Sequence, residues 1–246
     1  LALELTAAYV RFLPPAAMLE RFDQRLDLEA HADHPDRQRT LRATIEWSHG
    51  LLDEAERELF ARLAVFSGGW DLRAAQAICG QDCRADVLQT LSHLVDKSLV
   101  SIVEAQGSEP RFRMLETVRV FALERLVESG ELETMKLRHA EHFAAVSEEL
   151  GPRLAEHESW FSLIDPDREN LLAIHERAAE DERLVEPVIR IWAFLWSYAW
   201  SRGIARQILE VMDAVAPSVD RLPVEPRARH AFLMAAGLQL TGQMEE

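Results

Sequence analysis

The sequence predicts a mainly α-helical protein with one short β-hairpin, and three observations support this fold class. Apolar residues recur at helical spacing along nearly the whole chain. The 246 residues include only ten Gly and ten Pro, which favours long helices over many short strands. One segment, Ser98 to Glu104, is rich in β-branched residues. Hydrophobic residues make up 48% of the chain and charged residues 28%, a balance typical of folded globular proteins.

The first 37 residues predict two helices and a loop. Apolar residues at helical spacing indicate a helix over 1–12, which Pro14-Pro15 ends. A second helix is expected over about 16–26. A polar loop rich in His and Asp then runs to Arg37.

Four helices are expected between residues 38 and 97, and capping residues define two of their starts. Asp53 is an N-cap with Glu56 three residues later, the pattern of a capping box. Asp71 caps a shorter helix that Gly80 ends. The last helix has apolar residues at i, i+1, i+4, i+7 and i+8 from Val87. These criteria predict helices over about 38–52, from Asp53 to Gly68-Gly69, from Asp71 to Cys79, and over 84–97.

The β signal follows these helices directly. After Ser98 to Glu104, the turn Gly107-Ser108-Glu109-Pro110 leads into Arg111-Phe112-Arg113-Met114, which alternates polar and apolar residues. Three helices followed by a two-stranded ribbon is the order of a winged helix. The helix over 84–97 then occupies the position of a DNA-reading helix.

The rest of the chain is predicted to be helical. Gly130 ends a helix that begins at Glu116, and Gly151-Pro152 is expected to end the next one at residue 150. Asp165 is an expected N-cap, with Pro166 at the first helical position. The short connections predict antiparallel hairpins stacked as an α-solenoid. The expected helices cover 116–129, 131–150, 153–163, 166–181, 184–201, 204–215 and 226–242, and the expected domains cover 1–37, 38–130 and 131–246.

Charge and composition restrict the partners. The formal net charge is −15, and the acidic excess extends over both halves of the chain. Because nucleic-acid affinity depends on neutralising phosphates, this balance disfavours binding to nucleic acid or an anionic membrane. The longest uncharged apolar run, Ile191 to Ser201, has 11 residues, too few to span a bilayer. With two cysteines and no leader pattern at Leu1, we expect a cytoplasmic fragment of a longer chain.

Motifs for catalysis or metal binding are not evident. Neither Lys97 nor Lys136 follows a Gly, so a phosphate-binding P-loop is missing and ATP hydrolysis by this chain is not expected. Cys79 and Cys83 favour reduced thiols. Metal sites need three or four converging ligands. Two groups of His and acidic residues have no further ligands nearby, so capping or solvent-exposed roles are favoured for them. These groups are His31 and His34 with Asp33 and Asp36, and His139 and His142 with Glu141.

Tryptophans recur every four residues on one predicted helix, at Trp192, Trp196 and Trp200. A buried stripe in the core explains this spacing most simply. Alternatively, one of them lines the inner groove of the solenoid and stacks on a ligand or peptide.

The predicted recognition helix is electrically neutral. Arg84 and Lys97 are balanced by Asp86 and Asp96, and Gln89 is its main side chain suited to base contacts. A base-reading helix usually presents several Arg, Lys, Asn or Gln. We therefore expect the winged helix to serve as a scaffold rather than as a DNA reader.

Several blocks of the chain resemble the STAND-class (NB-ARC-like) signal-transduction ATPases of bacteria. Leu1 to Leu5 is similar to the end of that class's Gly-Leu-Pro-Leu-Ala-Leu-Glu-Leu segment. Similar blocks cover the winged-helix entry, its third helix, the strand-to-helix junction after the wing, and the start of a TPR-like array. They are Leu41–Ser48, Leu51–Glu56, Leu63–Trp70, Leu94–Val100, Phe112–Arg119, and Trp160 and Leu163 with Glu169–Leu171.

The resemblance implies a segment of a multidomain regulator of the LuxR or SARP type known from actinomycetes. Residues 1–37 would end an ATPase helical subdomain, and an ATPase core and an output domain would be partners in cis. ATP and ADP would bind to that core, so no cofactor is expected in this fragment. The TPR-like repeats would bind an inducer or a protein partner.

The resemblance also implies a nucleotide-sensing position. In the NB-ARC class a Met-His-Asp triad follows the wing strand, and its His binds the β-phosphate of ADP. Met114-Leu115-Glu116 occupy these positions here, so the donor is replaced by Leu115. Arg111 or Arg113 would substitute as a cation, or the parent protein would exchange nucleotide more freely. Alternatively, Leu115 packs under helix 116–129.

Two other functions remain open at this stage. A DNA-binding winged-helix regulator would need a basic surface on helix 84–97 or on the wing. An enzyme would need a deep pocket with converging, perturbed carboxylates or histidines.

Overall fold

The computed structural model describes residues 36–83, 86–103, 110–156 and 158–241. Contacts divide these residues into two compact units. The first, called here the winged-helix unit, comprises 36–65 and 70–132, and the second, the helical unit, comprises 66–69 and 133–241. The helices expected over 1–12 and 16–26, and the expected subdomain end at 1–37, fall almost entirely outside the described residues.

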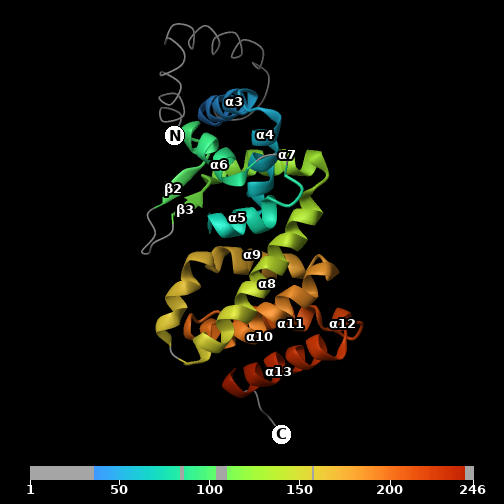
Figure 1. Cartoon of the computed structure of the whole chain (residues 1–246). Helices are drawn as coiled ribbons and strands as arrows, with labels where there is room; N and C mark the ends of the chain where they lie inside the picture. The colour runs from blue at the N-terminus through green and yellow to red at the C-terminus, as the bar shows by residue number, and fades with distance from the viewer. Residues whose placement is uncertain (1–35, 84–85, 104–109, 157, 242–246) are drawn as a thin grey trace, which may run out of the picture. The chain divides into compact units, whose positions relative to one another are not determined.

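The winged-helix unit contains five α-helices, a short 3₁₀ helix and three strands among its described residues. Figure 1 labels its helices α3 to α7 and the wing strands β2 and β3. The structure confirms the predicted combination of a winged helix with a β-hairpin wing, although the helix bounds shift by a few residues. In chain order the elements are α3 (Asp36–Gly50), α4 (Glu54–Arg62), η1 (Leu63–Val65), β1 (Gly69–Asp71), α5 (Leu72–Cys79), α6 (Val87–Asp96), β2 (Ser101–Val103), β3 (Arg111–Arg113) and α7 (Glu116–Ser129).

The core of this unit forms where α4 packs against α6 and α7. Apolar side chains at helical spacing on each helix point to this core, and burying each one contributes roughly 1.5–3 kcal/mol. The buried side chains include Leu59, Phe60, Leu63, Leu91, Leu94, Phe121 and Leu126.

The three strands form a sheet in the order β1-β3-β2. β2 and β3 are antiparallel, with Ile102 opposite Phe112. The sequence predicts this hairpin but not β1, whose central residue Trp70 is almost inaccessible to solvent. A three-residue strand shows no periodicity, and β1 pairs with a strand about 40 residues later in the chain.

The predicted helix starts at Asp53 and Asp71 and the predicted helix end at Gly130 are confirmed. The helix expected to run from Asp53 to Gly68-Gly69 instead ends at Arg62 and continues as a 3₁₀ helix to Val65. The Asp53 side chain accepts from the backbone N–H of Glu56, and the Glu56 side chain accepts from the N–H of Asp53, completing the capping box. Asp71 caps α5 in a similar way. Gly130 ends α7 in the left-handed conformation, at φ 76°, that glycine adopts without strain.

The helical unit follows, as predicted for the region after the wing (Figure 1). Its central helix, α10, contacts α9, α11 and α13, and it buries Ile189, Trp192 and Leu195. The described elements are α8 (Leu132–Glu156), η2 (Glu158–Leu163), η3 (Asp165–Asp167), α9 (Arg168–Ala178), η4 (Glu182–Leu184), α10 (Val185–Ser201), α11 (Ala205–Ala214), α12 (Ala216–Val219) and α13 (Val224–Thr241).

An ion-pair network connects three of these helices. The carboxylate of Glu148 on α8 accepts from Arg190 on α10 at 2.8 and 3.0 Å and from Arg229 on α13 at 3.2 Å. Hydrogen bonds from Arg190 hold the pKa of Glu148 below its ordinary value.

The predicted end of a helix at residue 150 is wrong, because α8 continues through Gly151 and Pro152 to Glu156. Gly151 is buried, and a Cβ there would lie 2.6 Å from a ring carbon of Phe194. Gly151 thus permits close packing and does not end the helix. Pro152 is exposed, where the chain tolerates the lost hydrogen bond more easily.

The predicted N-cap at Asp165 is also wrong. Asp165 starts a short 3₁₀ helix, and Ile164 precedes it without any side-chain cap bond. The Asp165 carboxylate instead accepts from the Tyr198 hydroxyl at 3.0 Å and from Arg202 Nε at 2.8 Å. Tyr198 and Arg202, which lie 33 and 37 residues away in the chain, thus bind the carboxylate in place of a local backbone N–H.

The helices of this unit differ widely in length, from 4 residues in α12 to 25 in α8. The TPR-like repeat interpretation therefore stays a prediction. In the described part of the chain, no helix combines the length and apolar character needed to cross a bilayer.

Candidate functional site

The candidate site is α6, the helix that precedes the β2–β3 wing, together with its contacts to α4. Asp86 caps α6 by accepting from the N–H of Gln89 at 2.8 Å, and the Thr90 hydroxyl donates to the Asp86 carbonyl. Val87, Leu91 and Leu94 face the core. The opposite face is exposed and presents Leu88, Gln89, Ser92, His93 and Asp96.

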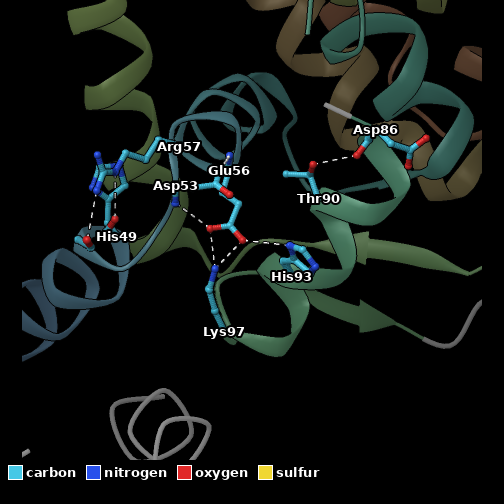
Figure 2. Close-up of polar contacts among 9 residues, drawn as sticks. His49, Asp53, Glu56, Arg57, Asp86, Thr90, His93 and Lys97 are labelled. Atoms are coloured by element: carbon cyan, nitrogen blue, oxygen red, sulfur yellow. Dashed lines mark hydrogen bonds and ion pairs between the residues drawn. The ribbon is translucent and has the colours of Figure 1, made fainter. Parts of the chain in front are cut away.

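A buried carboxylate on α4 engages the C-terminal end of α6 (Figure 2). Glu56 is 4% exposed. Both of its oxygens lie 2.6 Å from Nζ of Lys97, the residue that caps α6. Oε1 also lies 3.1 Å from Nδ1 of His93, and Oε2 accepts from the N–H of Asp53 at 2.9 Å. Glu56 thus binds both basic side chains of this end of α6 while it completes the cap of α4.

The start of α4 is also attached to the end of α3. The Arg57 guanidinium donates to the carbonyl of Gly50 at 3.2 Å and approaches that of His49 at 3.5 Å (Figure 2). A cation at the C-terminus of a helix is favourable because the carbonyls there carry partial negative charge. Burial, together with the nearby charges of Arg57 and Arg125, lowers the pKa of His49.

The wing and the residues after it hold the predicted nucleotide-sensing positions. Arg111 and Arg113 flank the buried Phe112 on β3, and Met114 lies in the core. Glu116 begins α7 and accepts from Arg119 at 2.7 and 2.8 Å. These hydrogen bonds, with a smaller contribution from Arg113, hold the pKa of Glu116 below its ordinary value.

Leu115 lies at the N-cap of α7 and is 41% exposed. The alternative interpretation expects the Leu115 side chain to pack under α7, but this side chain is partly exposed to solvent. A role in sensing nucleotide stays a prediction.

The three tryptophans of α10 lie in different surroundings. Trp192 is fully buried and packs edge-on against His175, with ring centroids 5.7 Å apart, whereas Trp200 is 47% exposed. Trp196 is half-buried. A kink at Leu195, with φ −100° and ψ 17°, interrupts the helical register between them. Trp192 is therefore a core residue, and a groove role for Trp196 or Trp200 stays a prediction.

The helical unit does contain a groove, but the tryptophans do not line it. It encloses about 970 Å³ among α11, α12 and α13. Its lining combines charged side chains with small apolar ones. The lining includes Asp213, Pro217, Val219, Asp220, Arg227 and His230.

A second buried polar cluster lies within the helical unit, around Asn170 of α9. Its Oδ1 accepts from the backbone N–H of Ser67 at 2.8 Å, and its Nδ2 donates to the carbonyl of Gly69 at 2.8 Å. His139 Nε2 lies 3.3 Å from the same Oδ1. Since Oδ1 can only accept, the proton of the neutral imidazole lies on Nε2.

His139 is completely buried between aromatic rings. Phe66 and Phe143 pack edge-on against it, with centroid separations of 5.3 and 5.0 Å. Burial lowers the pKa of His139 to about 3, so the ring is uncharged at neutral pH. Among the described residues, no group of three His, Cys, Asp or Glu side chains is arranged to hold a metal ion.

Sequence reasoning missed the wider role of both clusters. It placed Glu56 in a capping box, but the partner Lys97 lies 41 residues away. It used Asn170 only as part of a family resemblance. In both cases the missing information is a long-range contact that leaves no periodic signal.

Comparison with known proteins supports the winged helix independently. Residues 52–127 match the model of a winged helix-turn-helix domain family. The chain is 40% identical over 191 residues to proteins named as HTH-type transcriptional regulators in Mycobacterium tuberculosis and Mycobacterium bovis. This match covers 76% of the chain but only 21% of the relatives' length. No solved structure matches the chain significantly.

A further relative has no function in its name. It is a protein of M. tuberculosis that is 42% identical over 149 residues, which is 58% of this chain and 37% of that protein. The chain thus contains a winged helix-turn-helix domain followed by a helical region, and it is homologous to mycobacterial proteins named as transcriptional regulators. The finer assignment to the STAND class has no support in these matches.

Proposed function

We propose that this chain is the winged-helix and helical segment of a transcriptional regulator, and that α6 and the wing dock on duplex DNA. The observation that carries the proposal is the exposed face of α6, which follows α4 and α5 in the matched winged-helix domain and precedes the β2–β3 wing. The names of the mycobacterial relatives support the same class of function.

The exposed face of α6 suits a limited form of base contact. The Gln89 amide can pair with adenine in the major groove, and Leu88, which is 52% exposed, can contact a thymine methyl group. Arg111 and Arg113 place positive charge on the wing. Because the chain carries a net charge of −15, we expect weak binding that depends strongly on salt.

A second candidate function is a scaffold in an ATP-dependent regulator of the STAND class. The specific observation in its favour is that Glu56 engages both His93 and Lys97, which leaves α6 with little charge to offer phosphates. In this alternative an ATPase core and an output domain lie elsewhere in the parent protein. The winged helix would then respond to bound ATP or ADP, and the helical unit would bind an inducer or a protein partner.

Fluorescence anisotropy with a labelled duplex of about 30 base pairs distinguishes the two functions, at salt concentrations between about 50 and 150 mM. The DNA-docking proposal predicts binding that Gln89→Ala weakens. Gln76→Ala is the matched control, because Gln76 is an exposed glutamine of α5. Absence of binding at the lowest salt, or equal effects of the two variants, would favour the scaffold.

A further inference from the structure

We infer that Glu56 sets the strength with which α6 binds DNA, because it holds Lys97, at the C-terminal end of that helix, in an internal ion pair. This inference rests on the proposed function and adds a residue that regulates the same surface. Glu56 lies on α4 and is buried, so it acts through Lys97 and does not touch DNA itself.

The geometry of the pair directs the Lys97 amine to the carboxylate of Glu56. Its Nζ lies at 2.6 Å from both oxygens of one carboxylate, the short separation typical of a charge-assisted hydrogen bond. The Lys97 side chain is 23% exposed, so its amine is close to solvent but directed at Glu56.

The Lys97–Glu56 pair matters for DNA binding because α6 has few other positive charges. Between Asp86 and Lys97 the basic side chains are His93 and Lys97, and the acidic ones are Asp86 and Asp96. Glu56 contacts both basic groups. The described part of α6 and its caps therefore present two carboxylates and no uncommitted cation to a phosphate backbone.

A single additional phosphate contact has a predictable effect. Each cation that neutralises a phosphate adds about 0.9 to the slope of log affinity against log salt. At about 50 mM salt this slope corresponds to an increase in affinity on the order of tenfold. A purely structural role for Glu56 would change stability but leave this slope unchanged.

Glu56→Gln is the appropriate variant. A glutamine at this position still accepts from the N–H of Asp53, as in a regular capping box, but it carries no charge to hold Lys97. The matched control is Glu124→Gln, which changes the net charge equally. It also releases a cation, since Glu124 accepts from Arg42 at 2.7 and 3.0 Å.

The experiment measures binding of the whole chain to a labelled random duplex across about 25–200 mM salt. We expect Glu56→Gln to bind on the order of tenfold more tightly at about 50 mM, with a slope steeper by about one. Addition of Lys97→Met should remove the gain, and Glu124→Gln should show little gain. Equal gains in Glu56→Gln and Glu124→Gln, or a gain that survives Lys97→Met, would overturn the inference.

Lysine acylation followed by mass spectrometry tests the inference without relying on the folding of a variant. The chain has two lysines, and Lys136 provides an internal reference because it is similarly exposed, at 25%, and pairs with Glu133 by a single contact at 2.9 Å. We expect Lys97 to react severalfold more slowly than Lys136 in the wild-type chain. Equal or faster reaction of Lys97 would overturn the inference.

The outcomes also separate the inference from the proposed function. If the wild-type chain does not bind DNA but Glu56→Gln does so through Lys97, the inference holds and the proposed function fails. If the wild-type chain binds DNA through Gln89 and Glu56→Gln changes nothing, the proposed function holds and the inference fails.

Discussion

Glu56 in the winged-helix unit and Asn170 in the helical unit are both almost inaccessible to solvent, yet different kinds of partner satisfy them. Glu56 is charged and contacts a lysine, a histidine and one backbone N–H. Asn170 is neutral and binds two backbone groups of a single turn, with a neutral imidazole alongside.

The difference follows from the cost of burial. A buried charge needs a counter-charge, so the Glu56 cluster couples stability to electrostatics and to salt. An amide needs only hydrogen-bond partners, so the Asn170 cluster couples stability to shape and to the exact positions of two peptide groups. We therefore expect substitutions in the Glu56 cluster to lower stability through lost charge pairing, and substitutions in the Asn170 cluster to lower it through lost hydrogen bonds.

The largest expected effect is that of Asn170→Ala. The change removes the side-chain partner of the N–H of Ser67 and of the carbonyl of Gly69, which are part-buried, and each lost partner costs about 1–3 kcal/mol. We expect the free energy of unfolding to fall by about 3 kcal/mol in denaturant titrations. Asn170→Asp should lose at least as much, because it buries a carboxylate without a counter-charge and turns an oxygen toward the carbonyl of Gly69. A loss below about 1 kcal/mol for Asn170→Ala would show that the turn does not need the amide.

Glu56→Ala should have the next largest effect. It leaves the partly buried Lys97 amine unpaired and removes the reciprocal half of the capping box, with an expected loss of about 2 kcal/mol. Glu56→Gln keeps the capping hydrogen bond and should lose about half as much. If Glu56→Gln unfolds at the same denaturant concentration as the wild-type chain, the ion pair contributes nothing beyond the cap.

Gly68→Ala tests the shape of the turn that Asn170 binds. Gly68 has φ +90°, and a Cβ there would lie 2.5 Å from an oxygen of Glu169 and 3.1 Å from its Cβ. Gly130→Ala is the matched control, because Gly130 has φ +76° but nothing within 4 Å. We expect a loss of about 2 kcal/mol at Gly68 and about 1 kcal/mol at Gly130. Equal losses would mean that Glu169 moves aside at no cost.

Protonation of His139 has the smallest expected effect on the free energy of unfolding near neutral pH, but it makes this free energy depend on pH in acid. Burial lowers its pKa from 6.5 to about 3, so the unfolded chain binds this proton more readily than the folded chain does. The contribution to stability is complete above the unfolded value and is lost as pH falls from 6.5 towards 3, by up to about 1.4 kcal/mol per pH unit. NMR should show a neutral ring with the proton on Nε2 at about pH 5. Titration of the ring near its ordinary value would contradict the burial described here.

Sequence reasoning recovered the features that local chemistry determines. The capping box at Asp53, the cap at Asp71 and the helix end at Gly130 all depend on residues within four positions of one another, and all are confirmed. The β2–β3 hairpin was also predicted, because its strands lie close together in the sequence.

The features that sequence reasoning missed depend on distant partners. Asp165 has the right spacing for a cap, but Tyr198 and Arg202 compete for its carboxylate. Gly151 has the composition of a helix end, but Phe194 packs against it inside a continuous helix. The Glu56–Lys97 pair is of the same kind, since each residue has an ordinary local role as a cap.

NMR of the two lysine side chains reports directly whether Glu56 holds Lys97 away from DNA. With only Lys97 and Lys136 in the chain, a Lys136→Arg variant assigns both signals. As duplex DNA is added, the account predicts that the Lys97 signal stays unchanged in the wild-type chain and shifts in Glu56→Gln, while Lys136 is unaffected in both. A Lys97 signal that already shifts with DNA in the wild-type chain would contradict the account.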